Sequence, residues 1–421
     1  MQVLRAVRAG GVAVVLGSLL AGCSSASPAA APATSPATAG APGAGSPAPT
    51  PTSPTAGPAG PLACVAELPL GVRIGQTMLV TTTDLARVQP WLDDGLIAGL
   101  LASGVMSQST AQAFDRATSG TRYGALLAAD EEGGQVQRYR GLLGSMPSPQ
   151  AQARSMTPEQ VTAMWAEHAA ALRDWGVDLV LAPVADVGHG PGVGSRSFSD
   201  DPEVVGRYAT ATAQGIRTAG LLPVLKHFPG HGRTTGDSHD EARVIGPELD
   251  ELRAIDFQPF TEVLDAVGTD QVGVMVGHTQ VPGTAEEAAS QSPAVIEGML
   301  REELGFDGLV VSDALGMAAA GQPTQGDALV GFLRAGGDLG IVGPGGSQEG
   351  RRAVRAALAD GTLSQQRLDE AAATVLAAKG LDPCDLAAQG GDAAGADASP
   401  TPAEDGPPGS DPLVVNPTKE P

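Results

Sequence analysis

Short runs of apolar or β-branched residues alternate with longer amphipathic stretches through most of this chain. The short runs predict strands at residues 77–82, 97–102, 125–130, 178–184, 222–227, 271–276, 308–312 and 338–342. Helix-like segments lie between them, for example at residues 202–219, 293–304 and 325–335. Eight strands, most of them followed by a helix, predict an α/β fold with a single (β/α)8 TIM-type barrel.

A doubly wound open sheet is the alternative fold. Its Gly-rich dinucleotide turn, expected after the first strand, is missing from the sequence. The glycine clusters at residues 190–194 and 343–346 lack that context, and we interpret them as loops. The pattern therefore favours the barrel.

Polar residues occur at or just past the C-terminal ends of several predicted strands. They are Asp130, Asp186, Lys226, His227, His278 and Asp313. In a barrel these strand ends share one rim, where active sites are built. We therefore expect residues far apart in sequence to meet in one pocket.

The first 23 residues read as a targeting segment. Arg5 and Arg8 precede an apolar run that is too short to cross a bilayer comfortably, and the run ends in LAGC at Cys23. This ending resembles a bacterial lipobox, in which cleavage before the Cys leaves that Cys to carry lipid. An ordinary secretory signal is the alternative. We expect Cys23 to anchor the protein to the outer face of the bacterial cytoplasmic membrane.

The remaining regions differ sharply in composition. Residues 24–63 are almost only Ala, Pro, Ser, Thr and Gly, which predicts a semi-extended linker, because such a stretch buries too little apolar area to fold. Residues 386–421 form a similar but acidic tail. The folded catalytic domain is therefore expected at residues 64–385.

Composition excludes several classes of protein. With 42% hydrophobic residues, the 421-residue chain can bury a large core, so wholesale disorder is excluded. A net charge of −22 argues against a nucleic-acid partner, which would need a basic surface. Only 3% aromatic residues also argue against a stacking platform for single strands. We expect a monomer.

Two of the three cysteines, Cys64 and Cys384, lie at the edges of the expected domain. In an oxidising compartment they could form a disulfide that joins its two ends. Two unrelated thiols are the alternative, and we favour the disulfide.

Three of the six histidines fall within residues 226–239, in KHFPGHG at 226–232 and in DSH at 237–239. His227 and His231 are four residues apart, a spacing that suits two metal ligands on one helix. The Pro229-Gly230 pair between them prevents an unbroken helix. We therefore predict no metal.

This segment resembles the signature of glycoside hydrolase family 3, in particular its single-domain bacterial β-N-acetylglucosaminidase branch. The resemblance extends over nearly all of residues 65–380. It includes DEEGGQVQR at 130–138, APVADV at 182–187, SRSFSDDP at 195–202, LGFDG at 304–308 and VSDALGM at 311–317.

The resemblance implies a role for each matching position. Asp313 would be the nucleophile, and Asp237 and His239 would be the acid/base pair on the loop after the fifth strand. The positions that hold the terminal sugar are Asp130, Arg138, Arg196, Lys226 and His227. No cofactor or metal is implied.

Departures from the family pattern concern loop shape and leaving-group preference. Glu131 and Gln135 stand where the family more commonly has His and Arg. Arg233 stands where the family often has Asp, and residues 242–243 replace a Leu-Pro pair. None of them removes a catalytic group.

The chemistry also suits these residues on its own terms. Retaining hydrolysis needs one carboxylate to attack the anomeric carbon and another group to protonate the leaving oxygen. Asp313 at a strand end suits the first task, and capping of the next helix is its structural alternative. His239 titrates near neutral pH and suits the second, while Asp237 can fix its tautomer. Without the resemblance His239 could equally be an ordinary loop histidine.

We therefore expect a retaining exo-β-N-acetylglucosaminidase that removes terminal GlcNAc from peptidoglycan fragments (muropeptides). A β-glucosidase or a β-N-acetylglucosaminide phosphorylase on the same fold is the enzymatic alternative. A surface-tethered sugar-binding lipoprotein is the non-enzymatic one, and intact Asp313, Asp237 and His239 weigh against it.

Overall fold

The computed structural model describes residues 60–237, 244–284 and 286–389. The predicted signal peptide with Cys23, the predicted linker up to residue 59, His239 and nearly all of the acidic tail lie outside these ranges. In the part of the chain that is described, no helix is both long and apolar enough to span a membrane.

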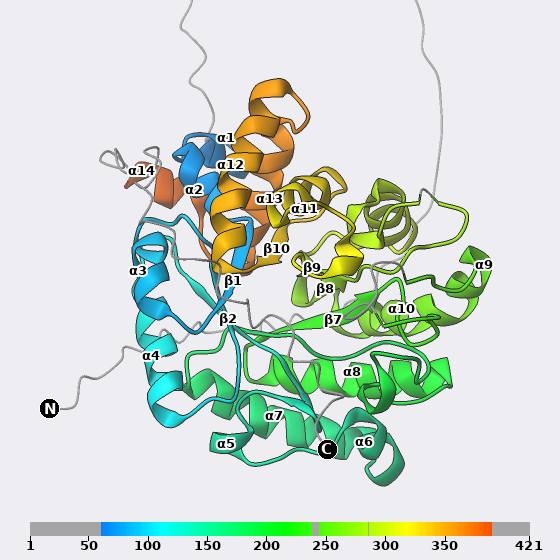
Figure 1. Ribbon diagram of the computed structural model, residues 1–421. Helices are drawn as coiled ribbons and strands as arrows, with labels where there is room; N and C mark the ends of the chain where they lie inside the picture. Colours follow the sequence, from blue (N-terminus) through cyan, green and yellow to red (C-terminus); the bar gives the residue numbers. More distant parts are fainter. Residues whose placement is uncertain (1–59, 238–243, 285, 390–421) are drawn as a thin grey trace, which may run out of the picture. The chain divides into compact units, whose positions relative to one another are not determined.

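Eight parallel strands close into a barrel, in the order β1-β10-β9-β8-β7-β6-β3-β2 (Figure 1). They are β1 (Met78–Thr82), β2 (Gly99–Ala102), β3 (Leu126–Ala129), β6 (Leu179–Val180), β7 (Leu222–Phe228), β8 (Gly273–Val276), β9 (Val310–Ala314) and β10 (Leu339–Val342). Each strand falls within or overlaps one predicted segment, so the predicted (β/α)8 barrel is confirmed.

Helices surround the barrel and connect its strands. The α-helices are α1 (Pro61–Ala66), α2 (Leu70–Gly75), α3 (Leu85–Asp93), α4 (Gln108–Thr118), α5 (Arg140–Leu143), α6 (Pro149–Ser155), α7 (Pro158–Asp174), α8 (Pro202–Thr218), α9 (Leu249–Glu251), α10 (Phe257–Val267), α11 (Gln325–Arg334), α12 (Pro344–Asp360), α13 (Gln365–Ala378) and α14 (Pro383–Ala388). The 3₁₀ turns are η1 (Gly194–Arg196), η3 (Thr269–Gln271), η4 (Ala289–Gln291) and η6 (Ala318–Ala320), and η2 (Leu252–Asp256) and η5 (Ala294–Glu303) are π-helical.

Sequence signals explain where the long helices begin. Thr157 caps α7 in a reciprocal capping box with Gln160, and Pro158 occupies the first turn, where its missing N–H costs nothing. At the start of α8 the Asp201 side chain accepts a hydrogen bond from the backbone N–H of Glu203, and Pro202 occupies the first turn. These caps fix the ends of two helices that pack side by side against the barrel.

Alternation along each strand decides which side chains face the barrel interior. Inward-facing Leu, Val, Ile, Met and Ala side chains from the strands form one core cluster, while the alternate residues belong to the cluster that packs against the helices. The inward series on three strands continues from Ala128 to Asp130, from Val224 to Lys226 and from Val311 to Asp313. The same alternation that fills the core therefore places these three polar side chains on the inner face of the rim.

Several segments differ from the prediction. The segment 178–184 keeps only two residues as a strand, because Pro183 has no N–H for the ladder, and beyond it Val184 forms an isolated bridge with Lys226. The hairpin of β4 (Glu131–Gly133) and β5 (Val136–Gln137) was not predicted. The predicted loop at residues 343–346 is wrong, because α12 begins at Pro344, whereas residues 190–193 do form a loop.

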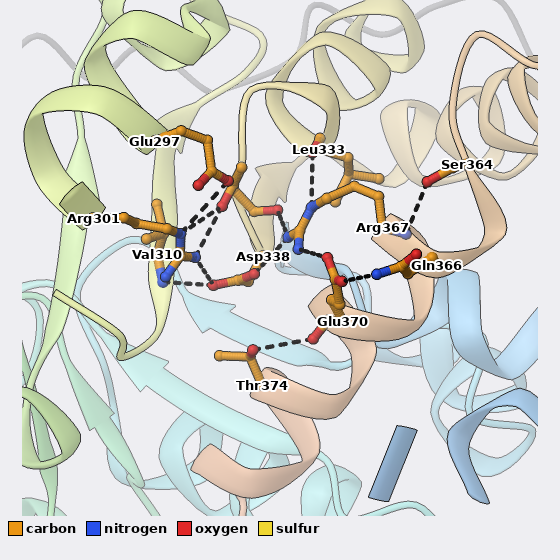
Figure 2. Close-up of polar contacts among 12 residues, drawn as sticks. Glu297, Arg301, Val310, Leu333, Asp338, Ser364, Gln366, Arg367, Glu370 and Thr374 are labelled. Atoms are coloured by element: carbon orange, nitrogen blue, oxygen red, sulfur yellow. Dashed lines mark hydrogen bonds and ion pairs between the residues drawn. The ribbon is translucent and has the colours of Figure 1, made fainter. Parts of the chain in front are cut away.

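A buried ion cluster closes the end of the barrel where the strands begin (Figure 2). Asp338, just before β10, is fully buried and accepts a hydrogen bond from the backbone N–H of Val310 on β9. Its carboxylate also pairs with Arg301 of η5 at 2.9 Å and with Arg367 of α13 at 2.7 Å. One side chain thus connects two strands to two helices.

The first and last helices of the described body pack against each other: α1 contacts α13 and α14, beside the closure of β1 with β10 (Figure 1). Cys64 of α1 and Cys384 of α14 are joined by a disulfide, with their Cα atoms 4.8 Å apart. This bond links the two edges of the domain covalently.

Candidate active site

A pocket opens at the C-terminal ends of the barrel strands and gathers six of the predicted site residues. They are Asp130, Arg138, Arg196, Lys226, His227 and Asp313, joined in the lining by apolar side chains that include Leu101, Met275 and Met317. The six polar residues come from β7, β9 and the segments after β3 and β6. The structure therefore brings together groups separated by up to 183 positions in sequence.

Asp130 and Lys226 form the centre of the polar wall. The Lys226 Nζ donates to Asp130 Oδ1 at 2.7 Å, and Arg138 Nη2 lies 3.4 Å from Asp130 Oδ2. Burial alone would raise the pKa of Asp130, but the charges of Lys226 and Arg138 lower it to about 2. Asp130 is therefore a carboxylate at neutral pH, flanked by two cations and still able to accept hydroxyl hydrogen bonds.

Glu132, which the sequence did not single out, lies behind this wall in contact with two of the predicted site residues. Its side chain has no exposed surface, and it holds Arg196 through two hydrogen bonds of 2.7 and 2.8 Å. The same carboxylate lies 2.5 Å from Lys226 Nζ. Its position in the 130–138 motif was the available signal, since a buried acid beside two cationic site residues fixes both of them.

The guanidinium of Arg196 is almost fully engaged by described residues. Besides its two bonds to Glu132, its Nη1 donates to the carbonyl of Gly192 at 2.9 Å and its Nη2 lies 3.4 Å from His227 Nε2. These four contacts use four of the five N–H groups of a guanidinium. Arg196 is thus held rigidly at the pocket rather than being a surface ion pair.

Asp186 organises the chain that leaves β7. It is fully buried and accepts hydrogen bonds from His227 Nδ1 at 2.7 Å and from the backbone N–H of His231, also at 2.7 Å. Burial would raise the pKa of Asp186, but the charge and hydrogen bond of His227, together with His231, lower it to about 2. Asp186 therefore orients the His227 ring, whose other nitrogen faces Arg196.

Asp313 lies within β9 and is half-buried, with its Oδ1 accepting from the backbone N–H of Ala314 at 2.7 Å. His278 follows β8, and its ring contacts Ser290 Oγ at 2.7 Å and the carbonyl of Ala314 at 3.0 Å. His278 is buried and holds the backbone next to Asp313. His278 therefore supports the end of β9 from behind and does not line the pocket.

Asp237 is half-buried on the chain after β7, beside His231 and the loop after β6. A methyl group built on Gly192 would lie 2.7 Å from Asp237 Oδ1 and 3.3 Å from His231 Nε2. His239, the second predicted member of the acid/base pair, lies outside the described residues.

A much larger cavity, of about 980 Å³, opens at the opposite end of the barrel. It is lined by residues at or just before the start of several strands, such as Leu126, Leu222 and Leu309, and by Lys379, whose pKa burial lowers to about 7. By size alone, this cavity would be the candidate active site. In (β/α)8 barrels, however, the chemistry is built at the C-terminal ends of the strands, and the smaller pocket holds the convergent carboxylates and cations.

A closed (β/α)8 barrel with carboxylates, arginines and a lysine around a rim pocket is the architecture of an enzyme that acts on a polar substrate, and the carboxylates are compatible with glycoside hydrolysis. The model of the glycosyl hydrolase family 3 N-terminal domain matches residues 70–378, and the chain belongs to this family. The predicted family resemblance is therefore confirmed.

Individual relatives agree with this assignment. The chain is 38% identical over 286 residues to the beta-hexosaminidase LpqI of Mycobacterium tuberculosis, covering 64% of this chain and 72% of the relative. A solved family 3 glycosyl hydrolase from Mycobacterium smegmatis aligns with a TM-score of 0.70 at 36% identity, over 75% of this chain and 98% of that one. A beta-N-acetylhexosaminidase from Beutenbergia cavernae aligns with a TM-score of 0.69 at 28% identity, over 75% of this chain and all of that one (100%).

Proposed function

We propose that this protein is a retaining exo-β-N-acetylglucosaminidase that removes terminal GlcNAc from peptidoglycan fragments. Membership of family 3 and the relatives named as β-hexosaminidases support a glycoside hydrolase of the β-N-acetylhexosaminidase type. The observation that carries the finer proposal is the convergence of Asp313 with the five sugar-binding residues in one rim pocket.

In this mechanism Asp313 attacks the anomeric carbon while the bond from that carbon to the bridging oxygen breaks. His239, with its tautomer fixed by Asp237, gives its proton to the leaving oxygen. The glycosyl–Asp313 ester is then attacked by water, whose proton returns to His239. Two displacements at one carbon give net retention of configuration.

The polar wall supplies the recognition of the sugar. Asp130 presents carboxylate oxygens, while Arg138 and Lys226 present charged donors next to it. Neighbouring hydroxyls on a sugar ring need this mixture of acceptors and donors. Lys226 is almost fully buried, and a bound polar ligand offsets part of the cost of keeping it there.

The natural substrate is proposed from the expected location of the protein. The sequence before the barrel reads as a lipoprotein signal ending at Cys23, followed by a linker. An enzyme tethered outside the cytoplasmic membrane would meet cell-wall fragments that carry terminal GlcNAc. Metabolic labelling with a fatty acid should mark the wild type and not Cys23→Ala, and equal labelling of both would reject the anchor.

The catalytic proposal is tested with purified protein and an aryl β-N-acetylglucosaminide. Asp313→Ala should lose about 10⁴-fold or more in kcat, the loss expected when an essential nucleophile is removed. Asp307→Ala is the matched control, because this exposed Asp precedes the same strand at the opposite end of the barrel. Full activity of Asp313→Ala would refute the assignment of the nucleophile.

Product analysis tests the substrate and the stereochemistry. Defined muropeptides should release free GlcNAc with the β configuration in the first spectrum, and added phosphate should not change the product. Release of GlcNAc-1-phosphate would instead identify a phosphorylase. Turnover of β-glucosides at the rate of N-acetylglucosaminides would contradict the proposed specificity.

A further inference from the structure

The loops that follow β6 and β7 are in direct backbone contact with each other. The N–H of Gly190 donates to the carbonyl of Gly232 at 2.7 Å. A methyl group on Gly232 would lie 2.2 Å from the carbonyl oxygen of Val187, a distance that real side chains do not reach. These two loops therefore fit together only because glycines line their contact.

Gly192 occupies a special place within this contact. Its φ of +79° is in the left-handed region, and the space beside its Cα is filled by Asp237 Oδ1 and His231 Nε2. On its other side the carbonyl of Gly192 accepts a hydrogen bond from Arg196 Nη1. One residue thus touches both a sugar-binding arginine and a carboxylate of the proposed acid/base pair.

The ring of His231 lies close to Asp237 beside Gly192. His231 is buried, with its backbone held by Asp186 and its Nδ1 3.1 Å from Thr279 Oγ1. Burial and the neighbouring His227 lower the pKa of His231 to about 4, so its ring is neutral at neutral pH. The ring therefore forms a fixed neutral surface beside Asp237 and next to Gly192.

We propose that Gly192 is a positioning residue that seats the carboxylate of Asp237 and couples it, through Arg196, to recognition of the terminal sugar. The proposal rests on the acid/base role proposed for Asp237. It assigns a task in proton transfer to the loop after β6, which supplies neither the proposed nucleophile nor a member of the proposed acid/base pair. The absence of a side chain at residue 192 is the property that matters, because a methyl group would push the carboxylate away.

The test compares Gly192→Ala with Gly194→Ala. Both glycines have positive φ, +79° and +50°, so both substitutions strain the backbone. No atom lies within 4 Å of a methyl group added at Gly194, so only Gly192→Ala also displaces Asp237. The two variants therefore separate backbone strain from the contact with the carboxylate.

Two substrates report on protonation of the leaving oxygen. The 2,4-dinitrophenyl β-N-acetylglucosaminide has a leaving group that needs no acid, whereas chitobiose needs one. Gly192→Ala should lose about 100-fold in kcat/KM on chitobiose and less than about 10-fold on the aryl glycoside, because misplacement by about 1 Å costs on the order of 10²-fold. Gly194→Ala should lose the same factor on both.

Asp237→Ala is measured in parallel and should show the same dependence on the leaving group. If it does while Gly192→Ala behaves like Gly194→Ala, the positioning role is wrong and the acid/base role stands. If Asp237→Ala loses equally on both substrates, the acid/base role fails and the inference fails with it.

A double variant covers the case in which Gly192→Ala does not fold. In Gly192→Ala/Asp237→Ala the contact with the carboxylate is gone and only the backbone strain remains, so this protein should fold and lose no more activity relative to Asp237→Ala than Gly194→Ala loses relative to the wild type. A double variant far less active than Asp237→Ala would overturn the proposal, since Gly192 would then act on something other than Asp237.

Discussion

Glu132 connects two site residues without lining the pocket itself. Its carboxylate bonds Arg196 twice and lies against Lys226, and it has no exposed surface. Glu132→Gln keeps the shape but removes the charge between two buried cations. We expect kcat/KM to fall about 100-fold, because hydrogen bonds to buried charged groups contribute about 1.5–3 kcal/mol each.

The neighbouring residue offers a matched control for this change. Glu131 is equally buried, but it contacts the His168 ring and the backbone N–H of Tyr139. Glu131→Gln should lower the melting temperature with little effect on kcat/KM. Equal losses of activity in both variants would mean that Glu132 acts through general packing of the hairpin and not through its two cations.

Ionisation of Asp256 makes the free energy of unfolding depend on pH. This residue is buried beside Arg233, with Oδ2 2.5 Å from Nη2, and burial raises its pKa to about 6 even with that cation present. An acid whose folded pKa exceeds its unfolded value of about 3.9 destabilises the fold as pH rises from about 4 to 6. Removing Arg233 would raise this pKa further.

Arg233→Met should therefore cost more stability at pH 7.5, where Asp256 is ionised, than at pH 5, where it is protonated. We expect a difference of up to about 2 kcal/mol in the free energy of unfolding, measured by urea titration at both pH values. In an Asp256→Asn background the cost of Arg233→Met should not depend on pH. A cost that is the same at both pH values in the wild-type background would contradict this reading of Asp256.

At the site, alternation predicts the residues that lie on strands and fails for those that act through loops. Asp130, Lys226 and Asp313 continue inward-facing series, so their convergence could be predicted from strand positions. Glu132 could not be assigned, because its partners come from segments 64 and 94 residues away, and a pattern does not give pairings. The contact between the Asp237 carboxylate and Gly192 depends on the paths of two loops. Loop paths cannot be predicted from the periodicity of the sequence.

At the scale of elements, the strands were predictable where β-branched and apolar runs were long enough. The segment 178–184 reads as one such run, but Pro183 ends the ladder early, and the chain continues with a single bridge at Val184. The π-helical form of η5 was not predictable, because its apolar spacing matches an ordinary helix. Sequence patterns therefore gave the order of elements better than their local geometry.

A substitution of Asp338 tests how strands and helices are held together, separately from catalysis in the pocket. Asp338→Asn would leave Arg301 and Arg367 without their shared buried carboxylate (Figure 2). We expect a loss of about 3–5 kcal/mol in the free energy of unfolding. The kcat/KM of the folded protein should stay unchanged, because this cluster lies at the N-terminal end of the barrel.

An exposed ion pair serves as the control for Asp338. Arg253 and Glu303 are 42% and 37% exposed, so Glu303→Gln should cost less than about 1 kcal/mol. Both variants are compared by chemical unfolding at neutral pH. If Asp338→Asn costs no more than Glu303→Gln, the buried cluster does not hold β9 and β10 to their helices as we infer.

At the scale of the whole molecule, the disulfide between Cys64 and Cys384 closes a loop with a sequence separation of 320 residues. Chain-entropy arithmetic for a loop of this length gives an upper limit of about 5–6 kcal/mol of stabilisation. The bond joins α1 to α14, the first and last helices of the described body, and β1 pairs with β10, the first and last strands, to close the barrel. Its effect should therefore be on opening of the ring rather than on the pocket.

Cys64→Ser/Cys384→Ser should lower the melting temperature by up to about 8 °C while leaving kcat/KM at 25 °C intact. A reductant should lower the melting temperature of the wild type toward that of the double variant and should not affect the variant itself. This pairing separates loss of the cross-link from any effect of the serines on packing of α1. The contrary result is that both thiols become alkylatable while the melting temperature of the wild type does not change. Helix packing alone would then hold the two ends together. The disulfide would not restrict the unfolded chain enough to affect the stability of the fold.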